Sequence, residues 1–328
     1  MVKKSAPIRF YDEEKIKKIN PNTLKYWKRY EMDMSLRELS PKTIYAYSND
    51  ALQWFIYILE NQGNVCITEL DENDVEEFLF FCKQSGNNSR RMKRRMSTIS
   101  AFYRYLRKKR IINENPMEFI DRPKKDVNVM VQTYLTKEQV NEMRVSLAKR
   151  VQKATLVSDK NLCLTMQVYA MFSLSTLARV NAVRNVKWDA IDYDDRIVIG
   201  VLEKEQRIVD LMFSSEVKDL LLELYNFRKH HGIQDGGYVF PAYYKGVYQP
   251  ISASALDVWC KEIGSMIGVS TLHPHDFRHS GATLLKNAGM SLEDVSSLLN
   301  HLGTDVTQKF YIKEDKKKIR EEKDKFEI

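Results

Sequence analysis

The second half of the chain holds arginine, histidine and tyrosine residues that could together bind an oxyanion and attack it. Arg179 stands upstream, the segment His-Pro-His-Asp-Phe-Arg-His contains His275 and Arg278, and Tyr311 follows ten residues after His301. On a helix, the three-residue spacing of His275 and Arg278 places both on one face. Guanidinium groups stay charged and donate paired hydrogen bonds, so they suit an anion whose oxygens gain charge during attack. A phenol has a reference pKa of about 10, and nearby cations favour its nucleophilic phenolate form.

Each of these residues has a more ordinary interpretation on its own. Arg179 could be a structural helix arginine, and Tyr311 is one of 17 tyrosines. His275 and His279 are four residues apart, like a zinc pair, but an aspartate replaces the glutamate of the zinc proteases and Arg278 would repel the ion. We therefore expect no metal and no other cofactor, and we interpret His279 as a residue that supports His275.

The segments around these residues are predicted to be helical, with one β insertion. The β-branched runs Arg196–Leu202 and Arg207–Met212 predict a hairpin with Lys204 at its turn. An apolar helix is predicted at Leu292–Leu299, directly before His301. Lys204 and His301 are the further candidates for contact with the anion.

The first half is predicted to be a set of helices after a loose, polar leader over residues 1–20. The pattern predicts a helix from Asn22 to Leu39 and a second helix that begins at Ser40-Pro41, a hydroxyl cap followed by proline. A third helix is predicted near Asn73–Lys83, with Asn73 as its N-cap.

A strongly basic stretch follows, with no acidic residue between Lys83 and Arg110. Ile99, Phe102 and Leu106 recur at helical spacing, so one helix should bury an apolar face and present bases on the other. A solvated face is the ordinary interpretation, but a run of one sign repels itself unless a polyanion neutralises it. The candidates for DNA-phosphate contact are Arg90, Arg91, Lys93, Arg94, Arg95, Arg104, Arg107 and Lys108.

Length and composition bound the remaining choices. The 328 residues suit two domains, and the net charge of +8 favours a polyanionic partner. Neither a membrane span nor a signal peptide is found, so we expect no membrane partner and a cytoplasmic, nucleoid-associated protein. The four cysteines lack metal-type spacing and are interpreted as reduced core residues.

Taken together, the motifs resemble those of the tyrosine recombinases, also called phage integrases. That family carries an arginine in a Thr-Gly-Leu-Arg-like turn, a hairpin lysine, a Pro-His-x-Leu-Arg-His motif, a Leu-Gly-His segment and a tyrosine soon after it. In this chain the corresponding positions, in the same order, are Arg179, Lys204, the Pro-His-Asp-Phe-Arg-His run that ends at His279, His301 and Tyr311. The resemblance covers nearly the whole chain.

The resemblance implies a mainly α, two-domain fold. Residues 1–122 would form a helical, DNA-grasping N-terminal domain ordered from about residue 20, and residues 123–133 a linker. Residues 134–328 would form an α+β catalytic domain with a small antiparallel sheet and a C-terminal interaction tail.

The implied activity is that of a site-specific DNA recombinase of the integrase or transposase type, acting without metal or ATP. Tyr311 would form a 3′-phosphotyrosine, and strand exchange would pass through a Holliday junction. Arg179 and Arg278 would hold the phosphate and His275 would accept the phenol proton. His301 would donate to the phosphate, and Lys204 would protonate the departing 5′ oxygen.

Two positions depart from the family pattern near Arg179. Leu177 stands where glycine is usual, and Ala182 replaces an acidic residue that is common three positions after the arginine. What takes the place of that acidic residue is left open by the sequence.

The implied partners are double-stranded DNA with specific recombination sites and three further copies of the chain. In residues 312–328, Ile312, Ile319 and Phe326 recur at seven-residue spacing, which suits either a frayed end or a helix that docks on a neighbouring subunit. The family leaves room for accessory DNA-bending or directionality factors. Two alternatives remain: a non-catalytic DNA-binding protein on the same fold, and an enzyme of the type IB topoisomerase kind.

Overall fold

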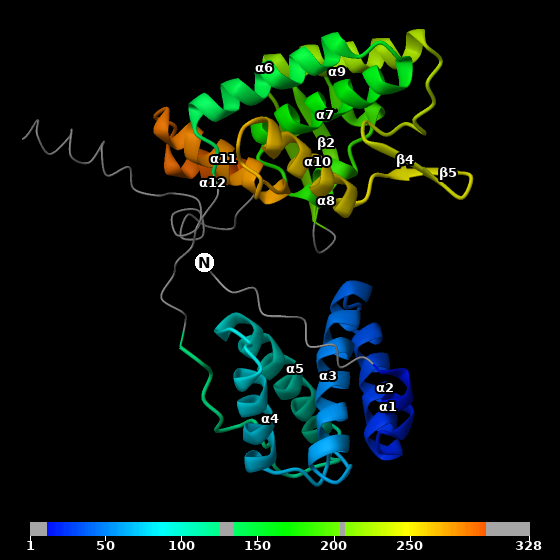
Figure 1. Ribbon diagram of the computed structural model, residues 1–328, viewed down its shortest axis with the longest axis vertical. Coiled ribbons are helices and arrows are strands. Elements are labelled where there is room, and N and C mark those ends of the chain that lie inside the picture. The colour runs from blue at the N-terminus through cyan, green and yellow to red at the C-terminus, as the bar shows by residue number, and fades with distance from the viewer. Residues whose placement is uncertain (1–11, 125–133, 204–206, 300–328) are drawn as a thin grey trace, which may run out of the picture. The chain divides into compact units, whose positions relative to one another are not determined.

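The computed structural model describes residues 12–124, 134–203 and 207–299. Backbone contacts divide the chain into two compact units, residues 1–130 and 131–328 (Figure 1). Each unit has its own hydrophobic core. Most of the predicted linker, residues 125–133, lies outside the described residues.

The first unit is a helical bundle around an aromatic core. Trp27 packs edge-on against Phe102, with ring centroids 4.9 Å apart, and against Phe55 at 5.6 Å. Such edge contacts stabilise a core beyond the burial of area alone. The helices are α1 (Glu13–Lys18), α2 (Pro21–Leu36), α3 (Pro41–Asn61), α4 (Glu72–Gln84) and α5 (Ser89–Lys108).

Helix starts in this unit are set by side chains that bond the first backbone N–H groups. The predicted start of α3 is confirmed, because Ser40 accepts a hydrogen bond from the N–H of Thr43 and Pro41 follows it. The predicted cap of α4 is wrong. The N-cap is Asp71 rather than Asn73, and Asp71 and Asp74 bond each other's backbone N–H groups at 3.0 and 2.9 Å.

The loose leader expected over residues 1–20 is wrong for residues 13–18, which form α1. Asp12 caps this helix by accepting from the N–H of Glu14. Lys15 pairs with Glu60 of α3, and Ile19 is buried against the core. The first unit therefore contains a helix before residue 20, where the sequence predicted a loose segment.

The second unit combines helices with two small antiparallel sheets. Its helices are α6 (Lys137–Lys153), α7 (Val157–Thr176), α8 (Val180–Arg184), the 3₁₀ turn η1 (Trp188–Ala190), α9 (Ser215–His230), α10 (Ala253–Met266), α11 (Pro274–Asn287) and α12 (Leu292–Leu298). Its strands are β1 (Ile191–Asp192), β2 (Ile197–Leu202), β3 (Ile208–Met212), β4 (Pro241–Tyr244) and β5 (Val247–Pro250). The predicted fold class is confirmed.

Helix α7 is the centre of the second unit. From Cys163 to Ser173 every residue is buried, as expected of a helical segment that packs against neighbours on all sides. Helices α6, α9 and α11 pack around it (Figure 1). Its C-terminal end, at Thr176, therefore lies where α11 and α8 can approach it.

The predicted hairpin is confirmed as β2 and β3, which pair antiparallel in a three-stranded sheet of order β1-β2-β3. A second hairpin, β4–β5, was not predicted and projects as an arm from the second unit (Figure 1). Its turn uses Lys245 and Gly246, both with positive φ, as a tight hairpin connection requires.

All four cysteines are free and buried, which confirms their interpretation as reduced core residues. Within residues 12–124, 134–203 and 207–299, no helix combines the length and the apolar content that crossing a membrane requires.

Candidate active site and nucleic-acid interface

A left-handed residue ends α7 and directs Arg179 away from the helix. Leu177, at the glycine position of the family turn, has φ +54°. Its backbone therefore adopts the conformation that glycine favours, at a steric cost of about 1–2 kcal/mol. The side chain of Leu177 is fully buried beside Leu299, and Arg179 then becomes the N-cap residue of α8.

Arg278 joins this turn to the end of α12. Its side chain is fully buried on α11 and donates hydrogen bonds of 2.6 Å to the carbonyl oxygen of Leu177 and 2.6 Å to that of Leu299. These carbonyls end two different helices, so one guanidinium fixes both ends relative to α11. The second predicted arginine is thus a structural link as well as a candidate phosphate ligand.

The start of α11 is fixed by reciprocal local contacts. Pro274 occupies the first turn, and the carboxylate of Asp276 accepts a 2.9 Å hydrogen bond from the N–H of His273. One turn on, Ser280 accepts a 2.8 Å hydrogen bond from the N–H of Leu135 and donates to the carbonyl of Asp276. The helix that carries His275 and Arg278 is therefore held rigidly.

His275 and His279 share one side of α11, with ring centroids 5.8 Å apart. Partial burial and the charges of Arg278, His273 and Arg179 lower the pKa of His275. Burial, His275 and Arg278 lower the pKa of His279 to about 4. Both imidazoles are therefore neutral near pH 7, and a neutral His275 can accept a proton.

Arg179 is held by a carboxylate that the sequence analysis did not select. Its Nη1 forms an ion pair with Glu203, the residue after the end of β2, whose side chain is 1% exposed. The arginine itself remains 30% exposed. A signal was present, because side chains alternate along a strand and Glu203 shares the inward face of Val201.

Three predicted catalytic residues, Lys204, His301 and Tyr311, lie outside the described residues. The described part of the site therefore consists of Arg179, His275 and Arg278, with Glu203 and His279 around them. Arg278 bonds the carbonyl of Leu177, two residues before Arg179, and His275 lies one turn before Arg278 on α11, so the fold brings the segments of all three together.

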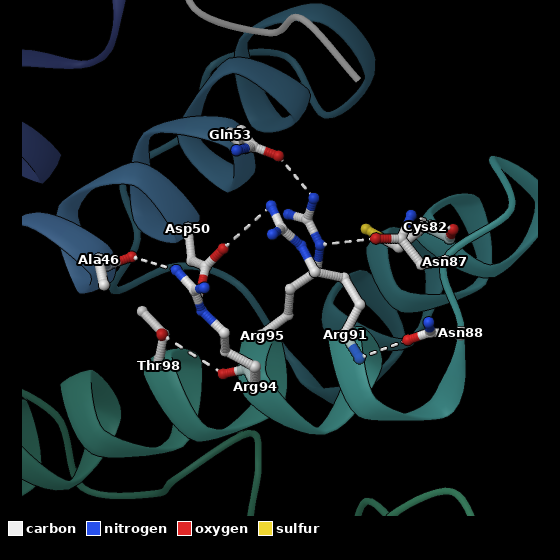
Figure 2. A network of polar contacts seen from close by, with 10 residues as sticks. All are labelled: Ala46, Asp50, Gln53, Cys82, Asn87, Asn88, Arg91, Arg94, Arg95 and Thr98. Atoms are coloured by element: carbon white, nitrogen blue, oxygen red, sulfur yellow. Dashed lines mark hydrogen bonds and ion pairs between the residues drawn. The ribbon is translucent and has the colours of Figure 1, made fainter. Parts of the chain in front are cut away.

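Some arginines of the basic helix α5 bind polar groups within the first unit. Figure 2 shows three of its arginines directed at polar side chains and carbonyls of neighbouring segments. Arg94 bonds the carboxylate of Asp50 at 2.8 Å, and Arg91 lies 3.6 Å from its other oxygen. Asp50 is itself buried in α3, so these two arginines neutralise a carboxylate that would otherwise be costly to bury.

Arg95 is a correction to the predicted DNA-binding set. It is 2% exposed and donates to Gln53 at 2.5 Å and to Asn87 at 3.3 Å (Figure 2). Burial lowers its pKa. Its guanidinium is part of the core of the bundle and is not on the surface where a phosphate would bind.

The remaining predicted bases of α5 lie at or near its surface. Four of these bases are exposed, and their helical spacing places them along one face of α5: Arg90, Arg94, Arg104 and Lys108. Arg107 is exposed too but pairs with Glu118 at 2.9 Å, and Lys93 is half-buried. Arg122 reaches Ser97 on the same face.

Both units of the chain match known protein families. Residues 133–318 match the phage integrase family, and residues 28–110 match the phage integrase N-terminal SAM-like domain. The first match alone covers more than half of the chain.

Curated relatives align over most of their length. The tyrosine recombinase XerC of Roseiflexus castenholzii is 26% identical over 275 residues, which cover 83% of each chain. A tyrosine recombinase of Pseudothermotoga lettingae is 27% identical and is covered over 92% of its length, with 87% of this chain aligned.

Solved structures show the same fold at lower identity. The XerH site-specific recombinase bound to a palindromic difH substrate gives a TM-score of 0.71 at 18% identity, covering 89% of this chain and 82% of that one. The Tn1549 transposon integrase in complex with circular intermediate DNA gives 0.63 at 16%, covering 91% and 98%. The turn at Arg179, the α11 motif and these matches agree, and the chain belongs to the phage integrase family, the tyrosine recombinases.

Proposed function

We propose that this site-specific DNA recombinase cuts one strand by attack of the Tyr311 phenol oxygen on a phosphodiester. The new bond is a 3′-phosphotyrosine and the leaving group is the 5′ hydroxyl. The reverse attack by a 5′ hydroxyl rejoins the strand, and the phosphotyrosine preserves the bond energy, so no ATP is consumed. The observation that carries the proposal is the hydrogen bond that Arg278, on the helix that also carries His275, donates to the carbonyl of Leu177, two residues before Arg179.

Each described group has a distinct proposed task. Arg179 is the accessible cation, and its exposed guanidinium stabilises the charge that builds on the non-bridging oxygens. Neutral His275 accepts the proton of the phenol. Arg278 donates to two helix-ending carbonyls, which hold its guanidinium in place, and it would bind the phosphate as the second arginine.

The remaining assignments complete the proton balance. Lys204 would give a proton to the departing 5′ oxygen and His301 would donate a hydrogen bond to the phosphate. His279 would fix the ring of His275 from one turn along α11. These roles rest on the family resemblance of the segments that carry the residues.

DNA is proposed to be gripped by both units. The catalytic unit, residues 134–328, would contact the cleaved site, while residues 1–122 would contact the duplex elsewhere. The exposed bases of α5, with Arg91 and Lys93 beside them, would bind phosphates, which supply affinity without reading the sequence.

Recombination is proposed to require four protomers on two DNA sites, with each C-terminal tail docked on a neighbour. A groove of about 530 Å³ is lined by Ile208 and Met212 of β3 and by Leu298 of α12. Ile208 and Met212 are more than half exposed and both line this groove, so they offer apolar surface to a docked segment. An apolar stripe such as that of residues 312–328 would fit this groove, and head-to-tail docking would close a ring.

The proposed biological setting rests on likeness of fold. Structures with this fold include the Tn1549 transposon integrase in complex with circular intermediate DNA and a lambda integrase dimer bound to a COC′ core site. We propose integration of a mobile element at the nucleoid, through a Holliday junction and with accessory DNA-bending or directionality factors, as the role of this chain.

A nicked suicide substrate tests the proposed reaction. The chain's own site is first found by footprinting on DNA that it binds. A nick just downstream of the cleavage point then lets the short fragment that bears the new 5′ hydroxyl diffuse away, so the strand cannot be rejoined. We expect a covalent protein–DNA band on a denaturing gel with the wild type and none with Tyr311→Phe, which still binds DNA.

The same assay separates the alternatives. Binding without an adduct in the wild type would leave a non-catalytic DNA-binding protein. An adduct together with relaxation of unrelated supercoiled plasmid would indicate an enzyme of the topoisomerase type.

A further inference from the structure

Glu203 is a buried acidic residue in the candidate active site, which is proposed to bind an anionic phosphate. Its side chain is 1% exposed and its Oε2 pairs with Nη1 of Arg179. Burying a carboxylate is costly unless a cation and hydrogen bonds compensate. Among the described residues Oε1 accepts no hydrogen bond, so Arg179 is the main compensation that this carboxylate has.

The acidic residue expected near Arg179 is absent from α8. Ala182, three residues after the arginine, is fully buried and cannot make a polar contact. Glu203 reaches the same guanidinium from the end of β2, a different element. The residue that directly follows β2 therefore supplies the carboxylate that the helix lacks.

The geometry of the contact leaves Arg179 available to a substrate. The ion pair uses Nη1, and within the described part of the chain neither Nε nor Nη2 of Arg179 donates a hydrogen bond. A guanidinium has five donors, so one side can face a protein carboxylate while the other faces a phosphate. Arg179 is partly exposed and Glu203 is buried, as expected if the protein-facing side of the guanidinium binds Glu203 and the exposed side binds the phosphate.

We propose that Glu203 is the positioning residue of Arg179, and that it replaces in this chain the acid that relatives carry three residues after the arginine. The inference rests on the proposed function, because Arg179 is taken as the phosphate-binding cation. Glu203 acts through Arg179: it restricts the rotamers of the long side chain before DNA arrives, so less conformational entropy is lost in the transition state.

A competing role would make Glu203 a stand-in for the phosphate, which DNA must displace. The two roles predict opposite effects of the isosteric change Glu203→Gln. If Glu203 blocks the site, the variant binds DNA more tightly and cleaves faster. If Glu203 positions Arg179, the variant cleaves more slowly.

A double-mutant cycle on the full chain tests the proposal. Single-turnover adduct formation is measured on the nicked substrate for wild type, Glu203→Gln, Arg179→Lys and the double variant. We expect Glu203→Gln to slow the wild type by about 10- to 100-fold, comparable to the loss on removing the hydrogen-bonding partner of a metal ligand. In the Arg179→Lys background the same change should cost less than about 3-fold, because the two residues act as one unit.

A matched control removes an arginine–glutamate pair elsewhere in the same unit. Glu216 holds Arg144 through hydrogen bonds of 2.5 and 3.0 Å, and Glu216→Gln should cleave at the wild-type rate. Thermal melting of each variant verifies that it is folded, and Glu203→Asp, which keeps the charge, should recover part of the rate. Faster cleavage by Glu203→Gln, or an equal loss in both arginine backgrounds, would overturn the proposal.

The equilibrium affinity for DNA supplies an independent readout. Arg179→Ala should weaken binding more when position 203 is glutamate than when it is glutamine. If the wild type binds DNA but forms no adduct, the proposed covalent reaction fails, and this binding cycle still decides whether Glu203 positions Arg179.

Discussion

Leu177 shows how one unusual residue connects two candidate catalytic groups. Its left-handed backbone turns the chain toward Arg179, its carbonyl accepts from Arg278, and its side chain packs into the small cluster with Val295 and Leu299. Glycine would adopt the turn without strain but would leave the cluster incomplete. The chain thus accepts backbone strain in exchange for a contact between the turn and α12.

Substitution at Leu177 separates the strain from the packing. Leu177→Ala keeps the strained backbone and loses the buried side chain, so we expect a loss of about 2–5 kcal/mol in the free energy of unfolding. Leu177→Gly loses the side chain but relieves about 1 kcal/mol of strain. Urea denaturation should therefore rank alanine below glycine, the reverse of the usual order, and alanine above glycine would refute the strained turn.

The histidines of α11 make a prediction about pH. Because the pKa of His275 is lowered from its ordinary value of 6.5, the neutral base form persists from pH 8 down to below about 6.5. The rate of adduct formation should therefore lose no base catalysis until the pH falls below that value, and then decrease as His275 gains a proton.

The stability of the protein should follow pH with the same sign. The folded-state pKa of His279 is about 4 and its unfolded value about 6.5, so the unfolded chain takes up the proton first. Stability is full above pH 6.5 and declines as the pH falls toward 4. Unfolding curves at several pH values should show this decline reduced in His279→Gln, and an unchanged decline would contradict the assignment.

At the scale of elements, the approach of α11 to α7 depends on a helical glycine. A Cβ on Gly281 would lie 2.3 Å from the carbonyl oxygen of Leu174 and 2.3 Å from a methyl group of Leu177. Neither neighbour can give way easily, because one is backbone and the other is buried in the turn. The glycine lets α11 hold Arg278 beside the end of α7.

Gly281→Ala should therefore disturb stability and site together. We expect a loss of about 1–3 kcal/mol in the free energy of unfolding, typical of overpacking, and slower adduct formation because Arg278 shifts with α11. Asn287→Ala, at the exposed end of the same helix, is the control and should change neither. Equal stability of Gly281→Ala and wild type would show that the helices are not in tight contact.

The basic face of α5 makes a separate prediction about DNA. Lys108→Ala and Arg104→Ala should each weaken binding to all DNA sequences and reduce the slope of log affinity against log salt by about 0.9. Titrations at several salt concentrations measure that slope. Arg107→Ala is the comparison, because this arginine is already paired with Glu118 and should change the slope less. Unchanged slopes for Arg104 and Lys108 would remove this face from the interface.

The sequence predicted the elements that have strong periodicity and missed those that lack it. The apolar face of α5 was predicted from its helical spacing, and the hairpin β2–β3 from its two runs of β-branched residues. The arm β4–β5 has four-residue strands bounded by prolines, which gives alternation too short to recognise. Arg95 was assigned to the surface by its charge, although it lies four residues before Ile99, on the buried face.

At the scale of the whole molecule, two units divide the proposed work. The first has its own aromatic core and presents bases from α5, and the second holds the arginines and histidines on helices packed around α7. The family order of the motifs allowed Arg179, His275 and Arg278 to be selected from sequence. It did not reveal Glu203, because the carboxylate that meets Arg179 follows a strand distant in sequence, and only the folded chain brings them together.

The identity of the residue that becomes linked to DNA tests the central claim most directly. After trapping on the nicked substrate, the complex is digested with nuclease and protease, and the peptide that carries a nucleotide is sequenced by mass spectrometry. We predict a nucleotide on Tyr311, with a signal that depends on Arg179 and Arg278. A nucleotide on any other residue, or a phosphotyrosine that forms equally well without these arginines, would contradict it.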